Sequence, residues 1–117
     1  KARETIISGI EKNYLLKGVT GSGKTEVYIS IIKSAFNEGK GSIFLVPEIS
    51  LTPQMINRFK GEFKENIAIL HSKLTASERA KEWYNIYIGK KKIVLGVRSA
   101  IFAPVENLGY IFLDEEH

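Results

Sequence analysis

The residues best suited to chemistry form an eight-residue segment near the start of the chain, at positions 18–25. This segment has a residue of the required type at every fixed position of the phosphate-binding loop G-x-x-x-x-G-K-[ST]. Backbone N–H groups of such a loop, together with the positive end of the following helix, surround phosphate oxygens. We predict that phosphate is bound by Gly18, Val19, Thr20, Gly21, Ser22, Gly23, Lys24 and Thr25. Lys24 is expected to reach the β- and γ-phosphates, and the Thr25 hydroxyl is expected to ligate Mg²⁺.

The segments on either side of this loop decide whether it is more than a glycine-rich turn. The apolar run at residues 14–16 predicts a strand, and residues 25–38 predict a helix. Its expected inner face carries Val27, Ile31, Ala35, Ile32 and Phe36. A strand, a loop and a helix in this order form the context that the phosphate-binding pattern requires, so an accidental turn is disfavoured.

A second chemical motif lies at residues 110–117, where an apolar run leads directly into Asp114 and Glu115. A strand of this kind delivers an acidic residue to the edge of a sheet. We expect Asp114 to hold Mg²⁺ largely through water, and Glu115 to be the general base for water attacking the γ-phosphate. A solvated acidic tail is the alternative, which the upstream loop disfavours. The paired carboxylates favour ATP hydrolysis over phosphoryl transfer to a metabolite.

The composition narrows the possible classes of protein. With 117 residues, of which 44% are hydrophobic, the chain is expected to form one globular domain. A net charge of +4 is compatible with a polyanionic partner. The absence of cysteine excludes disulfides, thiol chemistry and cysteine-ligated zinc within these residues. No apolar run approaches the length of a membrane span, so neither a membrane segment nor a signal peptide is expected.

Strands and helices are predicted to alternate along the chain. The expected strands are residues 14–16, 42–46, 66–70, 92–97 and 110–113. The expected helices are residues 3–12, 25–38, 51–63 and 75–88, the last opened by a capping box between Thr75 and Glu78. This order predicts an α/β fold, a three-layer sandwich of the P-loop NTPase type with a mainly parallel sheet of about five strands. Ligands bind beyond the carboxyl ends of such strands, so the motifs should meet at one edge.

The last four residues, Asp-Glu-Glu-His, resemble the DEAD/DEAH-type box of superfamily 2 helicases. Residues 46–54, Val-Pro-Glu-Ile-Ser-Leu-Thr-Pro-Gln, are similar to helicase motif Ia. Residues 96–104, Gly-Val-Arg-Ser-Ala-Ile-Phe-Ala-Pro, are similar to motif Ib, although that family usually has Thr where this chain has Val97. Together with the loop at Gly18, these strings most resemble the bacterial helicases of replication restart, from about residue 14 to residue 117.

The resemblance implies a RecA-like ATP-binding domain, and a function for the whole protein as a DNA-dependent ATPase and 3′→5′ DNA helicase in primosome assembly. It implies ATP and Mg²⁺ as cofactors and forked or single-stranded DNA as a partner. Further implied partners are a second RecA-like domain of the same parent chain, primosome proteins and single-strand-binding proteins. A bacterial cytoplasmic location is implied, with no membrane association, and zinc is expected only in other parts of the parent protein.

The resemblance also implies that this chain is a truncated piece. In ATPases of this class another strand lies between the strand before the phosphate loop and the strand before the acidic motif, and it would follow His117. We therefore expect a gap there, a displaced strand, or pairing with another molecule. The isolated chain is expected to be a nucleotide-dependent binding or switch module without motor activity.

Four residues of the two helicase strings are candidates for contacts with the sugar–phosphate backbone: Thr52, Gln54, Arg98 and Ser99. The alternatives are helix capping by Thr52 and a surface ion pair for Arg98. His117 is a candidate for sensing the γ-phosphate and coupling the nucleotide state to the DNA side, the alternative being an unstructured terminal residue. The basic run at residues 90–92 is interpreted as a solvated turn, and His71 as a residue that positions a loop.

Overall fold

The computed structural model describes residues 14–17 and 24–114, so the helix predicted for residues 3–12 lies outside the described part. The strands are β1 (Tyr14–Lys17), β2 (Gly41–Leu45), β3 (Ile67–Leu70), β4 (Ile93–Gly96) and β5 (Leu108–Leu113). The α-helices are α1 (Lys24–Asn37), α2 (Pro53–Phe63) and α3 (Ala76–Tyr87). Three short 3-10 helices are η1 (Glu48–Ser50), η2 (Lys64–Asn66) and η3 (Arg98–Phe102). None of these helices is long and apolar enough to cross a membrane.

The five strands form one sheet in the order β1-β5-β2-β4-β3, and every pairing between neighbours is parallel. This confirms the predicted α/β sandwich with a parallel sheet. Of the three arrangements expected between these strands, the gap is wrong for the described residues. β5 is instead displaced onto β1 and pairs with it directly, with Tyr14 opposite Tyr110 and Lys17 opposite Leu113. β5 also pairs with β2 on its other side, so it is a central strand.

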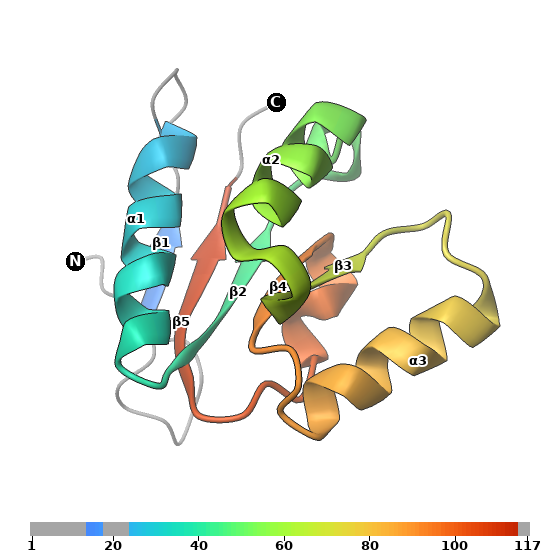
Figure 1. Cartoon of the computed structure of the whole chain (residues 1–117). Helices are drawn as coiled ribbons and strands as arrows, with labels where there is room; N and C mark the ends of the chain where they lie inside the picture. Colours follow the sequence, from blue (N-terminus) through green and yellow to red (C-terminus); the bar gives the residue numbers. More distant parts are fainter. Residues whose placement is uncertain (1–13, 18–23, 115–117) are drawn as a thin grey trace.

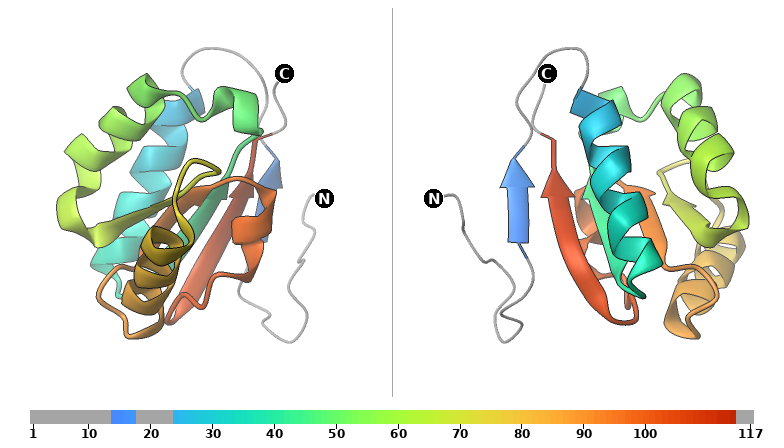
Figure 2. Two further views of the ribbon diagram at one scale, coloured as in Figure 1. Left: turned by 90° about the vertical axis from the view of Figure 1, so that its right-hand side faces the viewer. Right: turned by 60° about the vertical axis from the view of Figure 1, so that its left-hand side comes forward.

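Alternate residues of the strands supply two separate cores. The first contains the aromatic residues Tyr28, Phe44, Phe59, Phe63 and Phe112 and is covered by α1 and α2 (Figure 1). The second is aliphatic and contains residues of the opposite strand faces with residues of α3 and η3. Its members include Ile43, Leu45, Leu70, Val94, Ile111, Ile86 and Ala100. Figure 2 shows α1 and α2 side by side over the sheet and η3 behind it.

The inner face of α1 differs from the prediction, because one predicted residue is exposed and two residues that were not predicted are buried. Val27 is 51% exposed, whereas Tyr28 is only 5% exposed and packs in the aromatic core together with Ile29 and Ile32. Ala35 is buried, as predicted. Apolar residues occur on more than one side of this helix, so spacing alone did not settle which side faces the sheet.

The helix boundaries follow from local hydrogen bonds. The Thr75 hydroxyl accepts from the Glu78 N–H at 3.0 Å, while the Glu78 carboxylate accepts from the Thr75 N–H at 2.9 Å, which confirms the predicted capping box. Just beyond α3, Gly89 has a φ of +80°, a conformation that ends helices and suits glycine. α2 begins at Pro53 rather than at residue 51, because η1 and the cap residue Thr52 occupy the preceding positions.

Candidate functional site

The carboxyl ends of the parallel strands gather the predicted motifs at one edge of the sheet (Figure 2). η1 and the start of α2 follow β2, η3 follows β4, and Asp114 follows β5. Six residues separate the end of β1 from the start of α1. The edge therefore brings together the start of the helix that carries Thr25 and the segments that carry the other described candidates.

Asp114 lies where β5 leaves the sheet, and its backbone N–H donates to the Leu45 carbonyl oxygen at 2.9 Å. Its side chain is largely buried, with 9% exposure. The preceding residue, Leu113, is in register with Lys17, the last residue of β1. Asp114 is thus held at the level where β1 ends and the phosphate-loop segment starts.

Tyr28 is a residue of this region that the sequence analysis missed. It lies one helical turn after Thr25, and its ring centroid is 4.7 Å from that of Phe44 and 5.2 Å from that of Phe112. Burial, and next the negative charge of Asp114, raise the pKa of Tyr28 to about 12. The tyrosine therefore remains protonated at neutral pH, and a phenol hydroxyl lies within electrostatic range of the Asp114 carboxylate. Its spacing from Ile32 and Ala35 was the available signal.

The described oxygen donors suit a hard cation such as Mg²⁺. Thr25 is half-buried in the first turn of α1 and supplies a hydroxyl oxygen, while Asp114 supplies a carboxylate. Mg²⁺ usually takes one or two such groups and completes its octahedron with water and phosphate oxygens. No cluster of three or more His, Cys, Asp or Glu side chains suited to a metal was found among the described residues.

Several predicted residues lie outside the described part of the chain. These are Gly18, Val19, Thr20, Gly21, Ser22 and Gly23 of the phosphate loop, together with Glu115 and His117. Lys24 is described only as the first backbone position of α1. The roles assigned to all of these residues stay predictions.

Thr52 and Gln54 stand at the start of α2. The Thr52 hydroxyl oxygen accepts from the Met55 N–H at 3.2 Å, so Thr52 is the helix N-cap, as the alternative interpretation expected. A hydroxyl keeps its own hydrogen for donation while it accepts, so capping leaves Thr52 able to donate to a phosphate. Gln54 is exposed in the first turn of the helix.

Arg98 and Ser99 are both exposed on η3. The expected alternative for Arg98, a surface ion pair, is not found with any described residue. The Ala100 side chain beside them is buried, and the Val46 N–H donates to the Gly96 carbonyl oxygen at 2.9 Å. β2 and β4 are neighbours in the sheet, so the segments that follow them leave the same edge side by side.

The same two segments expose bulky apolar side chains that the sequence analysis did not single out. Ile49 of η1 is 78% exposed, and Phe102 of η3 is 79% exposed. Periodicity could not reveal them, because each lies in a short 3-10 turn just after a strand. Single exposed apolar side chains are common on protein surfaces, so their exposure alone assigns them no role.

Two basic or titratable positions have structural partners. The Lys91 ammonium lies 2.8 Å from a Glu82 carboxylate oxygen, which disfavours its use as part of a phosphate patch. His71 Nδ1 accepts from the Lys73 N–H at 3.1 Å, and Arg79 donates to the His71 carbonyl oxygen at 3.2 Å. His71 therefore organises the loop after β3, as predicted.

Comparison with known proteins gives a consistent family. The family model for DEAD/DEAH box helicases matches residues 1–117. The chain is 56% identical over 98% of its length to the replication restart protein PriA of Bacillus subtilis, covering 14% of that protein. It is 51% identical over 89% of its length to the PriA of Haemophilus influenzae, covering 14% of that protein. For the PriA of Helicobacter pylori the identity is 48% over 88% of the chain, covering 17% of that protein.

The chain thus spans about one seventh of the length of these relatives. A parallel sheet, an acidic residue leaving a central strand beside β1, and helicase-like segments after β2 and β4 fit the same family as the matches. The chain belongs to the DEAD/DEAH box helicase family.

Proposed function

We propose that this chain is the ATP-binding half of a DNA-dependent ATPase that acts as a 3′→5′ DNA helicase in replication restart. The observation that carries the proposal is the register of β5, which puts Asp114 level with the end of the strand that leads into the phosphate loop. Relatives that share 46% to 56% of its residues are named replication restart proteins. Because the chain spans one seventh of them, the activity is proposed for a longer protein in which residues 1–117 form part of one RecA-like domain.

In this proposal residues 18–25 hold the phosphates of ATP, and Lys24 contacts the β- and γ-phosphates. Thr25 and Asp114 hold Mg²⁺, which when bound neutralises part of the phosphate charge. Glu115 orients the attacking water and accepts its proton. Tyr28 keeps the Asp114 side of the site dry, because its ring fills the space between α1 and the sheet.

The nucleic-acid side of the proposal uses the segments after β2 and β4. Thr52, Gln54, Arg98 and Ser99 contact the sugar–phosphate backbone of one DNA strand. Contacts of this kind carry little sequence information, which suits a motor that moves over any sequence. His117 senses the γ-phosphate and links the nucleotide state to these segments.

The remaining partners follow from the family. A second RecA-like domain of the longer protein closes over ATP and supplies arginine fingers. Primosome proteins and single-strand-binding proteins act with it in the bacterial cytoplasm. Residues 1–117 alone should accordingly bind ATP·Mg²⁺ weakly and hydrolyse almost none, and DNA-stimulated turnover by this chain alone would contradict that part of the proposal.

ATP hydrolysis by the longer protein with single-stranded DNA present tests the function. Lys24→Ala should lower turnover by about a hundredfold or more, because a charge that stabilises the transition state is lost. Glu115→Gln should retain ATP binding but lower turnover by about 10²–10⁴-fold, as loss of a general base does. Lys81→Ala, on the exposed side of α3, is the matched control and should leave turnover unchanged. Full activity of Lys24→Ala would overturn the assignment.

A further inference from the structure

The two helices over the aromatic core begin at the two proposed binding sites. α1 starts at Lys24, next to Thr25, and α2 starts at Pro53, next to Thr52 and Gln54. Each follows a strand of the parallel sheet, so both start near the carboxyl edge and run away from it in the same direction (Figure 1). A link between these helices would therefore join the nucleotide side to the nucleic-acid side.

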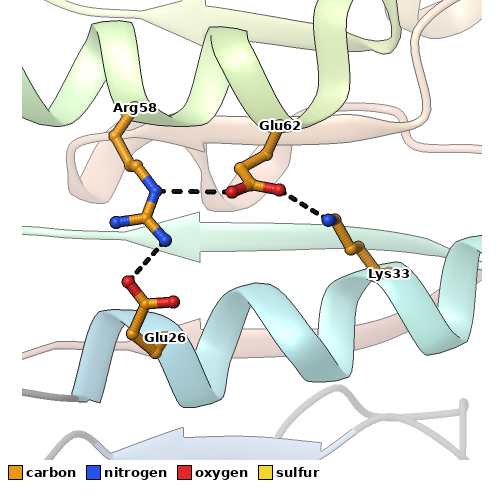
Figure 3. A network of polar contacts seen from close by, with 4 residues as sticks. All are labelled: Glu26, Lys33, Arg58 and Glu62. Carbon is orange, nitrogen blue, oxygen red and sulfur yellow. Dashed lines mark ion pairs between the residues drawn. The ribbon is translucent and has the colours of Figure 1, made fainter.

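Four charged side chains form such a link (Figure 3). The Lys33 ammonium of α1 lies 2.5 Å from one carboxylate oxygen of Glu62 on α2. Arg58 of α2 places its Nε 3.5 Å from the other oxygen of Glu62, and its terminal nitrogen pairs with Glu26 of α1. The charges alternate in the order Glu26, Arg58, Glu62, Lys33, so every neighbouring pair attracts and the total charge is zero.

The spacing of these residues places them on the facing sides of the two helices. Glu26 and Lys33 are two turns apart on α1, and Arg58 and Glu62 are one turn apart on α2. The ion pairs therefore cross between the helices at two levels (Figure 3). Because the two crossings are joined through Arg58, a shift of α1 along its axis or a tilt of it would strain the ion pairs at both levels.

The four charged residues lie close in sequence or along a helix to residues of both proposed binding sites. Glu26 follows Thr25 directly in the sequence. On α2, Gln54, Arg58 and Glu62 recur every four residues and so lie in one stripe, with Gln54 nearest the edge of the sheet. A displacement of the first turn of α1 would act on Arg58 through Glu26 and would be transmitted along this stripe to Gln54.

The link contributes little to holding the fold together. The Glu26 and Arg58 side chains are 61% and 39% exposed, and exposed ion pairs stabilise proteins only weakly. The helices are anchored separately by buried rings, since Phe44 of β2 contacts both Tyr28 of α1 and Phe59 of α2. A hydrogen bond from Lys33 lowers the pKa of Glu62, so this carboxylate stays charged at neutral pH.

We propose that Arg58 is a positioning residue that couples the nucleotide site at the start of α1 to the nucleic-acid site at the start of α2. The inference rests on the proposed function. Arginine suits the role because its planar guanidinium presents several donors in a fixed fork and meets Glu26 and Glu62 together. A lysine at this position would hold one carboxylate at a time.

The test uses the longer protein and a single-stranded DNA probe. The affinity for DNA is measured with and without a non-hydrolysable ATP analogue, and the ratio of the two affinities reports the coupling. Arg58→Met keeps the apolar stem but loses the charge, and should reduce this ratio about fivefold or more, within the usual range of coupling between sites. Each affinity measured without the other ligand should change less than about twofold, because Arg58 pairs with Glu26 and Glu62 and is not among the residues proposed to contact either ligand.

Matched variants separate coupling from general effects of charge. Lys60→Met removes one positive charge from the same helix, at an exposed residue that makes no ion pair with the described residues, and should keep the ratio. Glu26→Gln combined with Arg58→Met should lose no more coupling than Arg58→Met alone, because both act through one contact. Arg58→Lys should restore part of the ratio.

An unchanged ratio in Arg58→Met, or an equal loss in Lys60→Met, would overturn the inference and leave the proposed function standing. Loss of both single-ligand affinities together with a lower unfolding temperature in Arg58→Met would show a purely structural role and would also overturn it. Failure of the unaltered protein to bind ATP or DNA would overturn the proposed function itself, and the inference with it.

Discussion

The helices on the two faces of the sheet are positioned by side chains of different kinds. The first face is filled by large rings, and Phe44 has its ring centroid within 6.1 Å of those of Tyr28, Phe59 and Phe112. These rings hold α1 and α2 at a distance from the sheet and from each other. The charged residues of α1 and α2 then meet above the core, and the first turns of both helices stand at the carboxyl edge.

The second face is filled by aliphatic and small side chains, which allow close approach. A Cβ on Gly96 would lie 2.8 Å from the Leu70 carbonyl oxygen and 2.8 Å from the Ala100 Cβ, so η3 lies almost against the strands. α3 covers only part of this face and leaves Tyr84 and Tyr87 exposed on its outer side. Large side chains therefore set how far α1 and α2 lie from the sheet on the first face, and small side chains let η3 pack close to the strands on the second.

Removing the central ring should break the first face most severely. Phe44→Ala should lower the free energy of unfolding by about 3–5 kcal/mol, because Phe44 is fully buried and touches three other rings. Urea denaturation measures this change. The neighbouring residue Ile43 faces the second core, and Ile43→Val should cost only about 0.5–1.5 kcal/mol. A loss well below about 3 kcal/mol in Phe44→Ala would contradict the central place of this ring in the first core.

Adding bulk should damage the second face. Gly96→Ala should lower the free energy of unfolding by about 1–3 kcal/mol, because the new methyl group meets backbone and side-chain atoms that must move. It should also weaken DNA binding, since η3 with Arg98 would be displaced. Gly61→Ala is the control, because a Cβ there meets nothing within 4 Å. Normal stability and DNA affinity in Gly96→Ala would contradict the close-approach argument.

Removing a helix cap on each face of the sheet should cost the same stability but have different effects on DNA binding. Thr52→Ala and Thr75→Ala each remove a side-chain cap and should each lower stability by about 1 kcal/mol. Only Thr52→Ala should also reduce the affinity for single-stranded DNA, because α3 carries no proposed contact. Thermal unfolding and DNA titration distinguish the two effects. If both variants bind DNA equally well, Thr52 has no role beyond capping.

The smallest expected effect concerns the charges above the first face. The lowered pKa of Glu62 means that its contribution to stability is present above the ordinary carboxyl pKa of 4.5 and is lost as the pH falls through the lowered value. Glu62→Gln should therefore differ from the unaltered protein at pH 6 to 7 and converge with it in stronger acid. Parallel stability curves across this range would show that the Lys33 contact has no influence on Glu62.

Local patterns predicted much of the fold and part of the site. The helix after the phosphate loop, the capping box at Thr75 and the parallel α/β sheet all follow from residue types at short spacing, and the structure confirms them. Asp114 was placed correctly at the end of an apolar strand. The family could be recognised for the same reason, because its motifs are short strings that need no knowledge of distant contacts.

Other features were decided only when distant segments packed together. The direct pairing of β1 with β5, the burial of Tyr28 in place of Val27, and the exposure of Phe102 each depend on which surfaces meet across the sheet. The bridge from Glu26 to Lys33 through Arg58 and Glu62 joins residues up to 36 positions apart. Sequence periodicity shows which side of a single helix or strand is apolar, but not which other element packs against it. The sequence by itself therefore determined the chemistry of the motifs. Tertiary packing decided which motifs lie close to one another.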